Sequence, residues 1–281
     1  MKHLRLALFD LGDTLVHIPS SRMEWVARAI FCLRNPLIGS RIDSKEMLSN
    51  LQVAIQAEWK TRIGENINWV RTEGDEQNYW LEFYTQILKR LGFHTIPQRL
   101  LEYLAAMQAN PESFVCFPEV HATLQALRAA GIELGIISNA FPSALKILMH
   151  HNLLHYFKYT LLSYEPPHGT DGIYAKPNPS IYQHAIDCSK VIAEEILFVD
   201  DRPLFVDGAE LVGIRSILID RTNQHPDWNK EKISDLREIV PIFKNLPPSR
   251  EIVYADEAQC CILWPSCRLN PPQFALNTTV V

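Results

Sequence analysis

The chain has 281 residues, of which 47% are hydrophobic, and its formal net charge is −5. These values are typical of a globular protein with an ordinary core, and the scattered Lys and Arg residues provide no basic field for nucleic acid. No apolar run approaches the roughly 20 residues that cross a bilayer, so we expect no membrane partner and a cytoplasmic location.

Short runs rich in Leu, Ile, Val and Phe recur along the chain and are typical of buried parallel strands. The predicted strands are Leu4–Phe9, Glu133–Ile137, Tyr159–Ser163, Ile196–Val199 and Arg215–Ile219. Amphipathic segments that predict helices lie between them, at Pro118–Ala130, Pro142–His150, Pro179–Cys188 and Pro203–Val212. Because strands and helices alternate, the sequence predicts an α/β fold with a doubly wound parallel sheet and helices on both faces.

A long interval after the first strand interrupts this alternation. Segments 44–64 and 73–92 have the pattern of long helices that end at Gly. We therefore expect an α/β core at 1–17 and 111–246 and an inserted helical domain at 18–110. The aromatic residues of the insert are expected to form its own core. They are Trp59, Trp69, Tyr79, Trp80, Phe83 and Tyr84.

The last segment, 247–281, has paired prolines around a short apolar piece without clear periodicity. It is predicted to be either a docked extension or a disordered tail. Cys260, Cys261 and Cys267 lie in this segment, but no C-x-x-C spacing or nearby His indicates a metal site.

Polar side chains stand at the ends of several predicted strands, where ligands gather in open α/β sheets. They are Asp10, Ser138, Asn139, Asp200 and Asp201, and Lys176 adds a positive charge from the loop before a helix. Each of them alone is also typical of a helix cap, a turn or a solvated surface residue. Two adjacent acids directly after a buried strand are costly without a cation, so the combination indicates a site.

These residue types suit phosphoryl transfer. The carboxylate of Asp10 can attack phosphorus and form an acyl-phosphate, which divides one difficult displacement into two easier ones. A carboxylate repels a phosphate dianion, and Mg²⁺ bound by Asp10 and Asp200 would offset that repulsion. Ser138 and Asn139 can donate hydrogen bonds to phosphate oxygens, and Lys176 supplies a compact positive charge.

Four segments resemble, in order, the motifs of the haloacid dehalogenase-like (HAD) hydrolase superfamily, most of whose members are Mg²⁺-dependent phosphatases. They are "FDLGDTL", "IISNA", "KPNPSIYQHAI" and "ILFVDDRPLFVDGAELVGIRSILI". The resemblance covers about Arg5 to Arg221 and implies a Rossmann-like core, with the helical insert as a C1-type cap. It implies that Asp10 is the nucleophile, Ser138 the motif II hydroxyl, Lys176 the motif III lysine and Asp200 the motif IV metal ligand. Asp201 matches the second acid of the variants that carry "DD".

The sequence departs from the family pattern at Gly12. The phosphatases usually have a second Asp at this position, which protonates the leaving oxygen and later activates water. The family also uses the backbone carbonyl there as a metal ligand, so the implied metal set is Asp10, Gly12, Asp200 and Asp201. Asp13 is a substitute candidate for the catalytic acid, and His17 is a second one. Losing a general acid typically costs about 10²–10⁴-fold in rate, and least for leaving groups that depart without a proton.

Three hypotheses follow for the function. The first is a Mg²⁺-dependent phosphomonoesterase that acts on a small phosphorylated metabolite through an aspartyl-phosphate. The second is a catalytically weakened protein that binds phosphate for a regulatory purpose, which Gly12 favours. The third is a haloacid dehalogenase, whose chemistry needs no metal and which the Asp200–Asp201 pair disfavours. The sequence specifies neither a substrate nor an oligomeric state.

Overall fold

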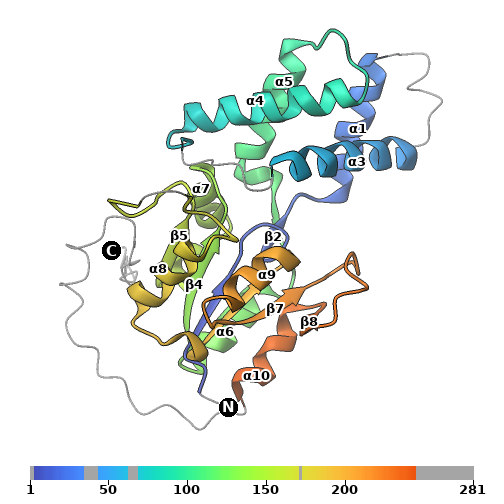
Figure 1. Cartoon of the computed structure of the whole chain (residues 1–281). Coiled ribbons are helices and arrows are strands. Elements are labelled where there is room, and N and C mark those ends of the chain that lie inside the picture. The colour runs from blue at the N-terminus through green and yellow to red at the C-terminus, as the bar shows by residue number, and fades with distance from the viewer. Residues whose placement is uncertain (1–2, 35–43, 63–68, 171–172, 245–281) are drawn as a thin grey trace, which may run out of the picture. The chain divides into compact units, whose positions relative to one another are not determined.

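The computed structural model describes residues 3–34, 44–62, 69–170 and 173–244 (Figure 1). Within these ranges, no helix is both long enough and apolar enough to cross a membrane. The extension predicted at 247–281, with its three cysteines, lies outside the described residues.

The chain forms two compact units. The first combines Met1–Leu15, Phe117–Asn139 and Asn152–Val281, and the second combines Val16–Cys116 and Ala140–His151. The predicted insert at 18–110 therefore falls within the second unit, which also contains a segment from the middle of the chain.

The first unit contains a six-stranded sheet with the order β5-β4-β1-β6-β7-β8. Its strands are β1 (Leu6–Phe9), β4 (Glu133–Ser138), β5 (Tyr159–Leu162), β6 (Ile196–Asp200), β7 (Arg215–Ile219) and β8 (Lys232–Ile233). All neighbouring strands pair in parallel, and Leu6 lies beside Glu133 on one side and Ile196 on the other. The strands read as continuous apolar runs because helices cover both faces of such a sheet.

The described residues of this unit form the α-helices α6 (Val120–Ala129), α8 (Pro179–Ser189), α9 (Pro203–Glu210) and α10 (Val240–Lys244). Helices α8 and α9 bury apolar side chains against one face of the sheet, in a cluster with Leu6, Leu8 and Phe198. From the central strand β1 the chain moves to one side of the sheet through α6 into β4, and from β6 it moves to the other side through α9 into β7 (Figure 1). Because crossovers between parallel strands are right-handed, α6 and α9 lie on opposite faces of the sheet. The predicted doubly wound α/β sheet is therefore confirmed.

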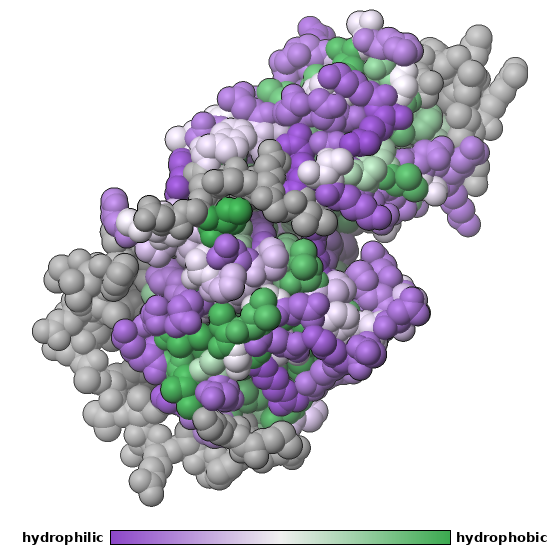
Figure 2. All heavy atoms as spheres, in the orientation of Figure 1, coloured by the Kyte–Doolittle hydropathy of each residue, from purple (hydrophilic) through white to green (hydrophobic). Residues whose placement is uncertain are grey.

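The described part of the second unit is mainly helical and includes one short pair of antiparallel strands, β2 (Val16–His17) and β3 (Val115–Cys116). Its helices are α1 (Ser20–Arg34), α3 (Ser44–Arg62), α4 (Glu73–Arg90), α5 (Gln98–Ala109) and α7 (Ser143–His150). The side of this unit seen in Figure 2 is largely hydrophilic, as expected for helices with one buried face.

The aromatic residues predicted to form the core of the insert mostly do so. Tyr79, Trp80, Phe83 and Tyr84 are buried in one cluster, and Trp59 packs against it while partly buried. The prediction is wrong for Trp69, which is 50% exposed. Trp69 precedes α4 and is not on its buried face, so the periodicity of that helix does not apply to it.

Helix α7 belongs to the helical unit because the residues before it pack there. The ring of Phe141 lies 4.6 Å from that of Tyr79 and 5.0 Å from that of Trp80, measured between ring centroids. The buried carboxylate of Glu76 accepts hydrogen bonds from the backbone N–H of Ser143 at 2.8 Å and from its hydroxyl at 2.6 Å. Glu76 therefore satisfies a donor at the first turn of α7 that has no partner within the helix.

Candidate active site

Three strand ends bring the predicted acids to one edge of the sheet. Asp10 directly follows β1, Ser138 is the last residue of β4, and Asp200 is the last residue of β6. Strand β1 lies between β4 and β6, where the chain order reverses direction across the sheet. Ligands of open α/β sheets bind at the carboxyl ends of strands at such a switch point.

The carboxylate of Asp10 has one oxygen fixed by two donors. Oδ1 accepts a hydrogen bond from the Ser138 hydroxyl at 2.9 Å and from the Lys176 ammonium at 2.5 Å. The side chain remains 10% exposed, and none of the described residues donates a hydrogen bond to Oδ2. One oxygen is thus held in place while the other is available to attack a substrate.

Lys176 is buried between two acids. Its side chain is 0% exposed, and Nζ donates to Asp10 and to Oδ2 of Asp200, each at 2.5 Å. Burial is the largest influence and opposes the charge, but Asp10 and Asp200 together outweigh it and raise the pKa of Lys176. The rings of Phe198 and Phe205 lie 5.5 and 4.9 Å from Nζ. The structure therefore places the ammonium where it neutralises two carboxylates instead of extending from the protein.

Asn139 lies next to the same lysine but contacts its backbone. The amide nitrogen donates to the Lys176 carbonyl at 2.8 Å, and the amide oxygen accepts from the Lys176 N–H at 2.7 Å. This reciprocal pair joins the end of β4 to the loop that carries Lys176. In this arrangement Asn139 orients the lysine, whereas the sequence predicts a direct contact with substrate.

The acids at the end of β6, Asp200 and Asp201, lie close together beside a single lysine. Asp200 is 0% exposed and also accepts the Arg202 N–H at 2.9 Å. Burial, opposed by Lys176 and reinforced by Asp10, raises the pKa of Asp200 to about 6.

Asp201 is in a less favourable environment. Burial, followed by the charges of Asp200, Asp10 and Asp13, raises its pKa well above the ordinary value. No N–H or O–H group in the part of the chain that the structure describes donates a hydrogen bond to its carboxylate. A cation beside Asp201 would relieve this repulsion.

The loop after Asp10 has free space around Gly12, the position at which the family pattern has its second Asp. Gly12 is exposed, and a Cβ added there would meet nothing within 4 Å. Asp13 is exposed and has φ 55°, a left-handed conformation that Asp tolerates better than most residues. It lies close enough to raise the pKa of Asp201. His17, the other substitute candidate, lies in β2 of the helical unit.

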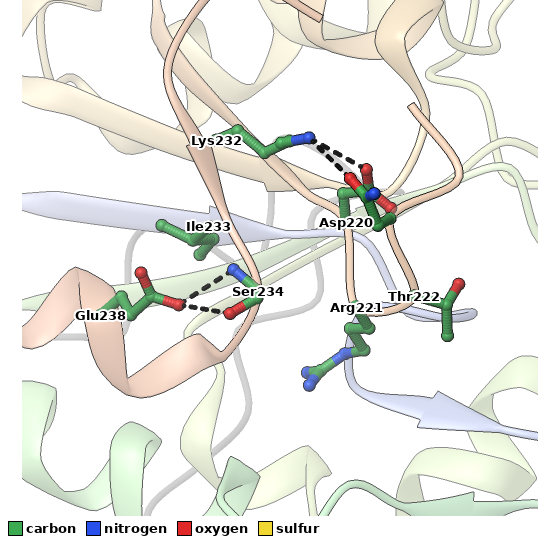
Figure 3. A pocket seen from close by; sticks show the side chains of 8 residues that line it. Asp220, Arg221, Thr222, Lys232, Ile233, Ser234 and Glu238 are labelled. Atoms are coloured by element: carbon green, nitrogen blue, oxygen red, sulfur yellow. Dashed lines mark hydrogen bonds and ion pairs between the residues drawn. The ribbon is translucent and has the colours of Figure 1, made fainter. Parts of the chain in front are cut away.

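A pocket that was not predicted from the sequence lies beside β8 and the segment that follows β7 (Figure 3). This pocket of about 470 Å³ is lined by Asp220, Arg221, Thr222, Asn223, Lys232, Ile233, Ser234 and Glu238. Lys232 donates to Asp220 at 3.3 Å, and Glu238 accepts from the N–H and hydroxyl of Ser234 at 2.9 Å each. Because these groups pair with one another, we assign no ligand to the pocket.

Comparisons with known proteins agree on one family. A family model described as haloacid dehalogenase-like hydrolase matches residues 4–213. Phosphoserine phosphatase of Thermus thermophilus is 30% identical over 148 residues, 51% of this chain and 57% of that protein. (S)-2-haloacid dehalogenase 1 of a Pseudomonas species is 26% identical over 258 residues, 88% of this chain and 99% of that protein. A magnesium-bound HAD hydrolase of Bacillus subtilis has the same fold, with a TM-score of 0.60 and 19% identity over 86% of this chain and 99% of its own.

Proposed function

The chain belongs to the haloacid dehalogenase-like hydrolases, and from this premise we propose that it is a magnesium-dependent phosphomonoesterase of a small phosphorylated metabolite. The observation that carries the proposal is the acidic cluster around Asp201, where burial and the charges of Asp200, Asp10 and Asp13 outweigh the opposing charge of Arg202 and raise the pKa of Asp201. An anionic substrate would be repelled there unless a cation accompanied it.

In the proposed reaction, Oδ2 of Asp10 attacks phosphorus while the bond from phosphorus to the leaving oxygen breaks. Ser138 and Lys176 hold Oδ1, so the carboxylate does not need to reorient as it attacks. The product is an aspartyl-phosphate. Water then attacks its phosphorus, which releases phosphate and restores the carboxylate of Asp10.

Magnesium fits the chemistry of the donors at this edge. Within the described ranges, no group of three His, Cys, Asp or Glu side chains is placed to hold a metal ion. Mg²⁺ does not require such a group, because it is usually bound by one or two carboxylates together with water and phosphate oxygens. When bound, it would reduce the electrostatic repulsion between the phosphoryl oxygens of the substrate and the carboxylates of the site.

The hydrogen bonds of the site favour one set of metal ligands over the set implied by the family resemblance. Asp200 is committed to Lys176 and to the Arg202 N–H, whereas Asp201 accepts no hydrogen bond within the described structure. We therefore propose that Mg²⁺, when bound, is held by Asp201 together with two ligands that the family resemblance implies, Asp10 and the backbone carbonyl of Gly12, while Asp200 holds Lys176.

Gly12 restricts the substrates that such a site can hydrolyse quickly. No carboxylate at that position protonates the leaving oxygen, so aryl, acyl and anomeric phosphates, which leave readily as anions, are the expected substrates. The phosphatase named among the relatives of this chain supports phosphate as the reacting group.

The second candidate is a haloacid dehalogenase, and Gly12 also favours it. A halide leaves carbon without a proton, so the missing acid carries no penalty in that reaction. Oδ2 of Asp10 would displace the halide and form an ester. Water would then attack the acyl carbon of Asp10 and release the hydroxy acid.

Isotope labelling separates the two candidates. We would assay aryl phosphates with Mg²⁺ and 2-haloacids without it, each in H₂¹⁸O, with Asp10→Asn as the control. The proposal predicts that phosphate is released and contains ¹⁸O, while the Asp10 side chain remains unlabelled. Halide release with ¹⁸O in the Asp10 peptide would instead establish the dehalogenase. Binding of beryllium fluoride with Mg²⁺ but no turnover of either substrate class would favour a phosphate-binding regulatory protein.

A further inference from the structure

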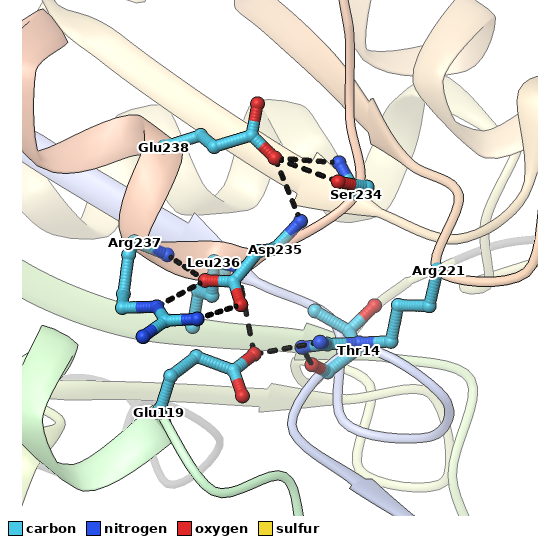
Figure 4. A network of polar contacts seen from close by, with 8 residues as sticks. All are labelled: Thr14, Glu119, Arg221, Ser234, Asp235, Leu236, Arg237 and Glu238. Atoms are coloured by element: carbon cyan, nitrogen blue, oxygen red, sulfur yellow. Dashed lines mark hydrogen bonds and ion pairs between the residues drawn. The ribbon is translucent and has the colours of Figure 1, made fainter.

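Arg221, two residues after the end of β7, is a largely buried arginine whose two terminal nitrogens both donate hydrogen bonds (Figure 4). One terminal nitrogen donates to Oε1 of Glu119 at 2.6 Å, and the other donates to the backbone carbonyl of Thr14 at 2.8 Å. The side chain of Arg221 is 13% exposed and that of Glu119 is 6% exposed. Because the guanidinium is planar and charged and donates to two acceptors, it restrains the positions of both partners more strictly than a single hydrogen bond would.

The same guanidinium lies flat against a third segment. Its central carbon is 3.6 Å from the centroid of the Phe117 ring. The N–H of Phe117 donates in turn to the carbonyl of Leu15 at 3.1 Å. Arg221 therefore joins the loop after Asp10, the segment that starts at Phe117 and the beginning of α6.

These contacts coincide with the limits of the first compact unit. The chain leaves this unit after Leu15 and returns to it at Phe117. The loop Leu11–Thr14, which ends at the Arg221 contact, contains Gly12 and Asp13 and begins directly after Asp10. A small displacement of this loop would move the backbone next to the attacking carboxylate.

We propose that Arg221 is a positioning residue for hydrolysis: it anchors the Thr14 carbonyl and the Phe117 ring, and so holds the loop after Asp10 in its reactive position. The contacts of Arg221 are with Glu119, Thr14 and Phe117, and not with Asp10, Asp200 or Asp201. Its effect on the reaction is therefore indirect and acts through the backbone between Asp10 and Leu15. Only the kinetic part of the test rests on the proposed function.

Hydrogen exchange tests the anchor without any substrate. The amide of Leu15 donates to the Leu11 carbonyl at 3.0 Å, and the amide of Phe117 donates to Leu15, so both report on the anchored segments. We expect Arg221→Met to speed exchange at these two amides by about tenfold or more, because a hydrogen bond from a charged donor is worth at least that factor. Arg221→Lys is expected to restore little of the protection, since an ammonium can neither form the fork nor stack on Phe117.

Arg215→Met is the matched control, because Arg215 begins the same strand and forms an exposed bidentate pair with Glu231. It should leave exchange at Leu15 and Phe117 unchanged. Thermal melting identifies variants that are globally unfolded, and Arg221→Lys keeps the test usable if Arg221→Met does not fold.

The kinetic arm uses whichever substrate shows Asp10-dependent turnover. The proposal predicts that Arg221→Lys lowers kcat by about tenfold or more with a smaller change in KM, because misplacing the reacting group costs rate. If Arg221→Lys has the same exchange rates at Leu15 and Phe117 and the same kcat as the wild type, the proposal is overturned and Arg221 is only a stabilising charge. If no substrate is turned over, the proposed function fails, while the exchange measurement still decides the role of Arg221.

Discussion

Replacing Lys176 with Met should produce a large loss of stability, because it removes the cation from a buried cluster of acids. Both carboxylates that contact Nζ are at most 10% exposed, and the lysine side chain itself is 0% exposed. Removing one partner of such a buried pair typically costs about 3–5 kcal/mol in the free energy of unfolding. The assay is urea denaturation of wild type and variant at pH 8 and pH 5.

The effect of pH on this variant has a definite sign. The pKa of Asp200 is already raised to about 6 in the folded protein, and losing Lys176 raises it further. A carboxyl group whose folded pKa is raised favours the folded state when protonated, so the variant should recover stability as the pH falls from 8 to 5.

Lys158→Met is the matched control, because Lys158 pairs with Glu133 at 2.7 Å on the same unit while 41% exposed. An exposed pair of this kind contributes at most about 1 kcal/mol, with little dependence on pH over this range. If Lys176→Met costs no more than Lys158→Met at pH 8, the description of Lys176 as the buried counter-charge is refuted.

Three further changes test the site and the helical unit. Asp201→Asn should raise the melting temperature at pH 8 in metal-free buffer, because the raised pKa of Asp201 disfavours its ionised form in the folded state. The gain should disappear near pH 4. An unchanged melting temperature at pH 8 would contradict this description of Asp201. Gly12→Asp should speed the hydrolysis of alkyl phosphates by about 10²-fold and that of aryl phosphates far less, because alkoxide leaving groups depend more strongly on protonation. Phosphate release measures both rates. Equal effects on the two substrate classes would count against the role given to Gly12. Glu76→Gln should destabilise the helical unit by about 1–3 kcal/mol, as followed by tryptophan fluorescence in urea, because an amide N–H₂ would then face the N–H of Ser143; no change would argue against this cap.

The sheet could be predicted from the sequence because its central strands are buried on both faces. Runs such as Leu6–Phe9 and Ile196–Val199 are apolar without interruption, and the structure places the ends of β1 and β6 within two residues of the prediction. Strand β8 was not predicted, because its two residues at the sheet edge, Lys232 and Ile233, are too few to form a hydrophobic pattern.

The residues that meet at the site followed from their places at strand ends, but their partners did not. Asn139 was expected to face substrate, and its pairing with the Lys176 backbone depends on a loop conformation that no local pattern specifies. The complete burial of Lys176 likewise results from two distant acids, Asp10 and Asp200, because a lysine in a Pro-rich loop is ordinarily exposed.

The placement of α7 in the helical unit also lay beyond sequence reasoning. The segment has the amphipathic pattern of a helix that covers a sheet. Its contacts in the second unit include those of Ser143 and of the preceding Phe141, whose partners on α4 are more than 60 positions earlier in the chain. The function of the helical unit as a cap that selects the substrate stays a prediction.

The central claim is that Asp10 is the nucleophile, with Oδ1 held by Ser138 and Lys176 and Oδ2 free to attack. The most direct measurement is rapid acid quenching during turnover of an aryl phosphate, followed by peptide mass spectrometry. The account predicts one added phosphoryl group on the peptide that contains Asp10, and none in Asp10→Asn. Turnover without this adduct, and undiminished in Asp10→Asn, would contradict it.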